Sequence, residues 1–328
     1  GSILLYIPFL EEYSKFYLTY IPIFFNLIFI LIIVFHFNLK KITELILCFL
    51  IIFSPSALLA MERFNIDILI FLMLILSCYV RSNFLNLAII SSITLVKFYP
   101  IVSSVVFFFK GNKFSKFCFF SIFLLIISTA IYLDFDNLKK IYISRNQFQA
   151  ISELSFSVYH LKNIPLLVSI LNENFIIIFI LIFSSIFFIF SFYYSKKLTF
   201  LKDFNFNFYE DRLFFLGAII CITVYFAFNN MYYREIFLFF LIPYLLIKKD
   251  RNLLINYLIY FIIFRYLVFL IINYYSVNLF ALYYYENSYL LIVKAFLDLF
   301  LISIIFGIFA RICNNFYITY KSKFYEFF

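Results

Sequence analysis

Long apolar runs separated by short polar segments make up most of the chain. A hydrocarbon core about 30 Å thick needs roughly 20 apolar residues in a helix. Full-length runs occur at Tyr17–Phe37, Ile42–Met61, Phe114–Leu133, Asn174–Tyr194, Leu253–Tyr274 and Tyr289–Ala310. Shorter runs occur at Ile66–Val80, Leu213–Phe228 and Ile236–Ile247. Because the runs are continuous and do not alternate as in barrel strands, the pattern predicts an all-α polytopic membrane protein with about nine spans.

The segment Phe84–Phe109 is long enough to span once, but Lys97 and Pro100 interrupt its middle. Proline breaks a helix and turns its predecessor, here Tyr99, away from helical geometry. Each half, with about a dozen residues, is too short to cross the bilayer alone. We therefore expect a re-entrant helix pair whose tip, near Lys97, opens to the external side. The alternative is a single tilted helix in which Lys97 snorkels to the interface.

The distribution of basic residues favours the re-entrant pair. Basic clusters occur at Lys110, Lys113 and Lys116, at Lys196, Lys197 and Lys202, at Lys248, Lys249 and Arg251, and at Arg311, Lys321 and Lys323. Cytoplasmic loops carry an excess of lysine and arginine, so these clusters, together with Lys40 and Lys41, are expected on the cytoplasmic side. Lys41 and Lys110 fall on the same side only if Phe84–Phe109 folds back.

The composition agrees with a membrane protein, because 13% of the residues are charged, against about 25% in a soluble domain. The basic residues behind the net charge of +9 sit in short loops between spans, which indicates orientation in the bilayer and not nucleic-acid binding. The five cysteines lack the spacing of a disulfide framework or metal site, and we expect no metal and no cofactor. With four glycines, small-residue packing between helices has little to work with.

We expect residues 1–328 to form a single transmembrane domain with an external loop at 134–165. The chain starts with Gly1, and its first residues read as native sequence cut within a protein. We therefore expect the chain to be truncated at its N-terminus.

Four polar residues lie at the start of the run Ile66–Val80, namely Glu62, Arg63, Asn65 and Asp67. Acidic residues near a helix N-terminus are favoured by the helix dipole, and Arg63 and Asp67 are spaced to pair on one helix face. One interpretation is a capped helix end with a structural ion pair. The other is a polar wall that binds a hydroxyl-rich substrate and offers a carboxylate as base or hydrogen-bond acceptor.

Cationic residues form the second set of candidates. Lys97, beside Tyr99 at the helix break, suits a phosphate oxygen as a point charge. Arg234 lies between two short runs and can bind phosphate or carboxylate in a bidentate manner. The alternative for Arg234 is interfacial anchoring together with Tyr232 and Tyr233.

Charged residues also lie inside apolar runs at Arg265, Lys294 and Asp298. Lys294 and Asp298 are spaced to share a helix face, and for all three we favour mutual neutralisation between helices. The sequence contains no glycine-rich phosphate loop and no GxSxG, HExxH or CxxC motif. A soluble nucleotide donor therefore lacks a site, and an activated substrate would arrive on a lipid.

Three segments resemble a known family. SPSALLAMERFNIDILIFLMLI resembles the P…ERGN-I-D-LLIFLLLLL segment of glycosyltransferase family 87, the polyprenol-phosphate-mannose-dependent mannosyltransferases of the GT-C superfamily. LVKFYPIV resembles the family's LKxYP segment, and NNMYYREIFLFFLIPYLL resembles a later segment of the type YRxIFLLxxxP. The resemblance spans most of the chain. Phe64 departs from it, because the family has glycine at that position.

The resemblance implies a GT-C-like bundle that moves a mannose-like sugar from a polyprenyl-phosphate donor to a glycan or glycolipid acceptor. It implies a site on the external, periplasmic face of the inner cell membrane. Its substrate-binding residues would be Glu62, Arg63, Asn65 and Asp67. Its donor-phosphate-binding residues would be Lys97, Tyr99 and Arg234. The catalytic residue is not assigned, because the family's aspartate is expected before Gly1, and the chain as given would then be inactive.

Two other functions remain open on the sequence. A transporter or flippase of lipid-linked saccharides would also use intramembrane charges and broken helices, but it should show paired repeats. An O-antigen-type polymerase or ligase would also have many spans and a large external loop.

Overall fold

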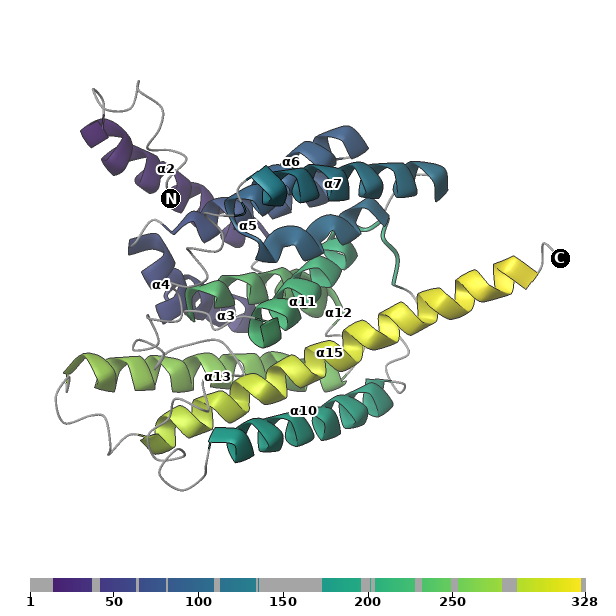
Figure 1. Ribbon diagram of the computed structural model, residues 1–328. Helices are drawn as coiled ribbons and strands as arrows, with labels where there is room; N and C mark the ends of the chain where they lie inside the picture. Colours follow the sequence, from purple (N-terminus) through teal and green to yellow (C-terminus); the bar gives the residue numbers. More distant parts are fainter. Residues whose placement is uncertain are drawn as a thin grey trace. The chain divides into compact units, whose positions relative to one another are not determined.

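The computed structural model describes residues 14–36, 42–62, 65–80, 82–108, 113–133, 135, 173–195, 201, 204–227, 232–248, 253–278 and 288–325. Every regular element within these ranges is helical (Figure 1), which confirms the all-α prediction. Among them, Phe114–Leu133, Ile255–Ile272 and Ile292–Ile318 are long and apolar enough to cross a membrane, and one bent helix pair would add a fourth span. The count of about nine spans stays a prediction. The predicted external loop at 134–165 lies outside the described residues apart from Phe135.

The chain divides into two compact units. Unit 1 comprises Gly1–Ala150 and Tyr233–Phe239, and unit 2 comprises Ile151–Tyr232 and Phe240–Phe328. The predicted single transmembrane domain would contain both units, and it stays a prediction.

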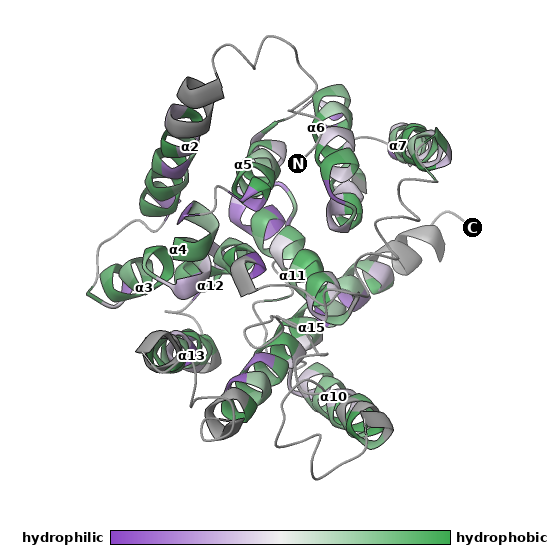
Figure 2. Ribbon diagram, turned by 60° about the vertical axis from the view of Figure 1, so that its left-hand side comes forward, coloured by the Kyte–Doolittle hydropathy of each residue, from purple (hydrophilic) through white to green (hydrophobic). Residues whose placement is uncertain are grey.

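Unit 1 contains α2 (Ser14–His36), α3 (Ile42–Ile52), α4 (Pro55–Glu62), α5 (Ile66–Tyr79), α6 (Asn83–Val96), the 3₁₀ helix η2 (Tyr99–Phe108) and α7 (Lys113–Leu133). The helices are hydrophobic over most of their length, with short hydrophilic stretches (Figure 2). Large apolar side chains cover their outer surfaces, among them Phe35 at 79% exposed, Phe117 at 69% and Tyr132 at 82%. Large exposed apolar side chains in this number agree with a membrane environment.

The predicted full-length run Ile42–Met61 is bent, and its two helices together are long and apolar enough for one span. The segment forms α3 and α4, which meet at an angle of 44°. Pro55 lacks the N–H that would continue the hydrogen-bond ladder of α3, and it is well suited to the first position of a new helix. The Ser54 hydroxyl donates to the Ile51 carbonyl at 2.8 Å and accepts from the Ala57 N–H at 3.2 Å. Ser54 thus caps α4 at the bend.

The predicted break at Lys97 is confirmed. Helix α6 ends at Val96, and Lys97 takes an extended conformation with φ −146° and ψ 142°. Pro100 lies in the first turn of η2, which packs against α6 and α7. The chain therefore consists of two packed elements here, as the half-helix interpretation requires. The position of this pair in a bilayer stays a prediction.

Unit 2 contains α10 (Glu173–Ser195), α11 (Tyr209–Ala227), α12 (Ile242–Lys248), α13 (Leu253–Asn278) and α15 (Ser288–Tyr325). The 3₁₀ helix η5 (Tyr232–Leu241) precedes α12, so the predicted short run Ile236–Ile247 is a 3₁₀ helix followed by an α-helix. Helix α15 has 38 residues and continues well beyond the predicted end at Ala310. It lies between α13 and α10 (Figures 1 and 2).

Aromatic pairs and one glycine join α10 to α15. Phe188 and Phe306 have ring centroids 4.4 Å apart. At Gly307 a Cβ atom would lie 2.6 Å from the Ser191 backbone carbonyl carbon and would also collide with the Ser191 side chain. Close approach of two helix backbones at a small residue is typical of membrane helices. The composition predicted little packing of this kind, and Gly307 is a position where it occurs.

Candidate functional site

The first turn of α5 supplies an amide and a carboxylate. The Asn65 side chain accepts a hydrogen bond from the Asp67 backbone N–H at 3.1 Å and so caps the helix. Asx residues stabilise helix N-termini in this way. The cap fixes the start of the helix and brings the Asp67 carboxylate, which is fully buried, into the interior of unit 1. The capped helix end of the first sequence interpretation is present, whereas the ion pair that it includes, between Arg63 and Asp67, stays a prediction.

Lys97 and Tyr99 both bind Asp67 from the break between α6 and η2. The Lys97 ammonium lies 2.7 Å from Asp67 Oδ1 and also donates to Asn65 Oδ1 at 3.2 Å. The Tyr99 hydroxyl donates to the same Asp67 Oδ1 at 2.7 Å. The extended backbone at Lys97 permits both side chains to reach one carboxylate oxygen. The helix break therefore ends α6 and also places Lys97 and Tyr99 within reach of Asp67.

Arg234, on the part of η5 that belongs to unit 1, approaches the other oxygen of Asp67. Its Nε lies 3.7 Å from Asp67 Oδ2, which is an ion-pair distance and too long for a hydrogen bond. Among the described residues, neither of these two buried atoms has a hydrogen-bond partner. The guanidinium carbon lies 4.9 Å from the centroid of the Tyr99 ring, within the range of a cation–π interaction.

The cluster combines a buried anion with partly accessible cations. The side chains of Lys97 and Arg234 are 22% and 15% exposed, whereas that of Asp67 is 0% exposed. Two cations and one carboxylate leave one formal positive charge on these three residues. The Phe237 ring packs edge-to-face on Tyr99 with centroids 5.6 Å apart. An aromatic wall lowers the local dielectric constant, which strengthens each electrostatic interaction in the cluster.

The other two predicted substrate-binding residues are Glu62 and Arg63. Glu62 is the last residue of α4 and is exposed. Arg63 lies outside the described residues, so its predicted pair with Asp67 has no structural description. Asp67 pairs with Lys97 and Arg234. Asn65 and Asp67, predicted to bind a sugar or acceptor, thus share one cluster with Lys97, Tyr99 and Arg234, predicted to bind phosphate.

Sequence reasoning did not identify the part-buried Asn26 and the buried Glu235 of unit 1. The Asn26 amide on α2 donates to the Met61 carbonyl at 3.0 Å, next to Glu62, and its Oδ1 has no hydrogen-bond partner among the described residues. Glu235, the neighbour of Arg234, is fully buried. A single Asn within the apolar run Tyr17–Phe37 was the available signal for Asn26.

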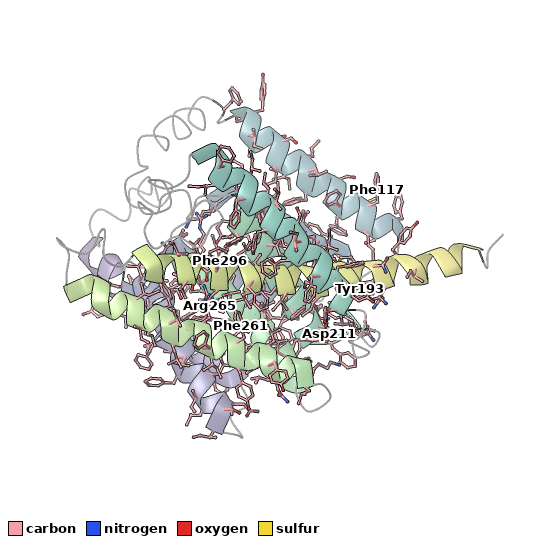
Figure 3. All side chains as sticks on the ribbon, turned by 90° about the horizontal axis from the view of Figure 1, so that it is seen from below. Phe117, Tyr193, Asp211, Phe261, Arg265 and Phe296 are labelled. Atoms are coloured by element: carbon pink, nitrogen blue, oxygen red, sulfur yellow. The ribbon has the colours of Figure 1, made fainter. Side chains whose placement is uncertain are left out.

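Unit 2 holds a separate charged cluster. Lys294 donates to Asp298 Oδ2 at 2.8 Å within α15, and Arg265 on α13 donates through Nε to Asp298 Oδ1 at 2.5 Å. Arg265 is labelled in Figure 3. All three side chains are at most 3% exposed. Buried charges are tolerated when they are paired. The predicted mutual neutralisation between helices is confirmed.

Comparison of the chain with protein families, with curated proteins and with solved structures gave no match. The resemblance to glycosyltransferase family 87 rests on the three sequence segments alone. In the structure, polar residues from all three segments meet in the Asp67 cluster. Asn65 and Asp67 come from the first segment, Lys97 and Tyr99 from the second and Arg234 from the third.

Proposed function

We propose that this protein is a membrane glycosyltransferase that uses a polyprenyl-phosphate sugar donor and binds the donor phosphate at Lys97, Tyr99 and Arg234. The observation that carries the proposal is the convergence of two partly exposed cations on one buried carboxylate at a helix break. Lys97 and Arg234 together carry more positive charge than Asp67 alone balances, and the Arg234 Nε has no hydrogen-bond partner within the described part of the chain. Such an arrangement suits an anion.

The lipid-linked form of the donor follows from the surroundings of the site. The helices of unit 1 expose large apolar side chains, and a lipid carrier can approach such a surface from the bilayer. The sequence has no glycine-rich phosphate loop for a nucleotide sugar. Arginine binds phosphate through a planar set of donors, and lysine binds it as a point charge. The mannose-like sugar and the external side of the inner cell membrane belong to the proposal through the family resemblance.

In the proposed reaction, a hydroxyl of a glycan or glycolipid acceptor attacks the anomeric carbon of the donor sugar. Its proton passes to a general base, and the bond between the anomeric carbon and the phosphate oxygen breaks. The electron pair stays on that oxygen, so polyprenyl phosphate leaves with one more negative charge than the donor phosphodiester had. Cations placed where charge develops stabilise such a transition state. Lys97 and Arg234 perform this task.

Asp67 does not serve as the general base in this proposal. Its side chain is fully buried, and its Oδ1 already accepts hydrogen bonds from Lys97 and Tyr99. A general base must come within hydrogen-bond reach of the acceptor hydroxyl. Asp67 is better placed to hold Lys97 and Tyr99 in position. The exposed Glu62 remains a candidate to line the acceptor site, and no base is assigned.

Arg234→Gln provides the clearest test, because Asp67 keeps its ion pair with Lys97 and its hydrogen bond from Tyr99 when Arg234 is replaced. The full-length protein is reconstituted in vesicles with polyprenyl-phosphate mannose, and transfer to membrane acceptors is measured. Loss of one donor to a developing oxyanion lowers the rate by about 10²–10³-fold. Lys116→Gln, in α7 of the same unit, is the matched control and should retain wild-type transfer.

Wild-type transfer by Arg234→Gln would remove the site from the mechanism. Movement of the donor lipid across the vesicle membrane without formation of a glycosidic bond would instead favour a transporter or flippase.

A further inference from the structure

Asp67 carries a negative charge at the centre of a site that is proposed to bind an anion. A carboxylate there repels phosphate, so its presence needs a physical reason. Asp67 Oδ1 accepts from Lys97 and Tyr99 at 2.7 Å each. A neutral amide would also accept these two hydrogen bonds, so hydrogen bonding alone does not require the charge. What only the carboxylate supplies is the cancellation of one of the two positive charges.

We propose that Asp67 sets the charge selectivity of the site, so that it prefers a singly charged phosphodiester to a doubly charged phosphate headgroup. The inference rests on the proposed function and deepens it. Among the three residues that pair in the structure, an ionised Asp67 leaves one net positive charge from Lys97 and Arg234, which one phosphodiester charge balances. The buried Glu235, next to Arg234 in the chain, is a second acidic residue that would oppose any further negative charge. A second negative charge would be bound close to a buried carboxylate with no third cation from these residues to compensate it.

This selectivity has a consequence for turnover. Sugar transfer converts a phosphodiester with one negative charge into a phosphomonoester, which carries about −1.5 to −2 at pH 7. The reaction product is therefore the headgroup that the site disfavours. Asp67 opposes retention of polyprenyl phosphate after each transfer, while Lys97 and Arg234 still stabilise the charge as it develops. The residue thereby acts in product release and not in bond cleavage.

Coulomb's law gives the scale of the effect. At an effective dielectric constant of about 20, two like unit charges about 5 Å apart disfavour each other by well over tenfold. In Asp67→Asn this repulsion is absent, while the amide oxygen still accepts from Lys97 and Tyr99. The ratio of dianion affinity to monoanion affinity should then rise by at least about tenfold.

The test measures binding of two lipids that share one polyprenyl chain to the protein in nanodiscs at pH 8. One lipid is polyprenyl phosphate, which is doubly charged at this pH, and the other is its monomethyl ester, which is singly charged. Wild type should bind the ester more tightly, and Asp67→Asn should shift the preference toward polyprenyl phosphate by at least about tenfold. In the sugar-transfer assay, Asp67→Asn should also be inhibited by lower concentrations of polyprenyl phosphate than wild type.

Two further variants make the result specific. Glu210→Gln, in unit 2, removes the same formal charge and should leave the affinity ratio unchanged. The double variant Asp67→Asn with Lys97→Met again leaves one positive charge, from Arg234, and should return the ratio toward that of wild type even though both affinities fall. This double variant also tests the inference if Asp67→Asn alone does not fold.

An affinity ratio that stays the same in Asp67→Asn and in the double variant would overturn the inference and leave the proposed donor site intact. Absence of binding of either lipid to wild type would overturn the proposed donor site together with the inference.

Discussion

The buried cluster of unit 2 makes a quantitative prediction about stability. Within the described residues, Arg265 and Lys294 both contact the carboxylate of Asp298, at 2.5 Å and 2.8 Å respectively. Asp298→Asn would keep the shape of the side chain and leave two buried cations facing a neutral amide. Removal of one partner from a buried ion pair costs about 3–5 kcal/mol. The expected loss of unfolding free energy therefore lies in this range.

Lys294→Met is the matched comparison for Asp298→Asn. It removes a charge from the same cluster, but Arg265 and Asp298 remain as a balanced pair on α13 and α15. The methionine side chain fills most of the space of the lysine stem and can keep the contact with the Phe269 ring, over which the Lys294 ammonium lies at 4.8 Å. We therefore expect Lys294→Met to cost clearly less than Asp298→Asn.

Unfolding of the protein in mixed micelles by increasing SDS, followed by circular dichroism, would give both free energies. The reasoning predicts that Asp298→Asn unfolds at a much lower SDS fraction than wild type and than Lys294→Met. If Asp298→Asn proves as stable as Lys294→Met, then charge balance does not hold α13 and α15 together, and the explanation of this cluster is wrong.

Two further predictions concern helix geometry and use the same unfolding measurement. Ser54→Ala should lower the stability by about 0.5–2 kcal/mol, the cost of losing an N-cap, because Ser54 caps α4 at the bend after α3. An unchanged stability would mean that Pro55 alone defines the bend. Gly307→Ala should cost about 1–3 kcal/mol through overpacking, because the new Cβ would collide with Ser191. Ser191→Gly should relieve only part of this cost, since the backbone carbonyl carbon remains 2.6 Å from the added Cβ, and full relief would contradict the described packing of α10 on α15.

Features encoded within a few residues could be predicted from the sequence. Pro100 and Lys97 indicated a break, and α6 ends at Val96. Lys294 and Asp298 share a face of one helix, and their predicted pair is present. The same proline rule applied to Pro55, but the apolar run around it was long enough for a full span and hid the bend between α3 and α4.

Contacts between distant segments could not be predicted in detail. The identity of Asp67's partners depends on how α5 packs against the break at Lys97 and on the placement of η5, and neither packing contact leaves a local sequence signal. The i,i+4 spacing favoured Arg63 as the partner, whereas Lys97, thirty residues further along, binds Asp67. The sequence therefore identified most of the residues of the cluster, and the structure showed how they are joined.

The most direct test of the central claim is an experimental structure of the protein with a polyprenyl-phosphate sugar bound. We predict that the donor phosphate lies within hydrogen-bond distance of both the Lys97 ammonium and the Arg234 guanidinium, with Asp67 still bound to Tyr99. A phosphate bound elsewhere, with Lys97 and Arg234 directed only at Asp67, would contradict the assignment of this cluster as the donor site.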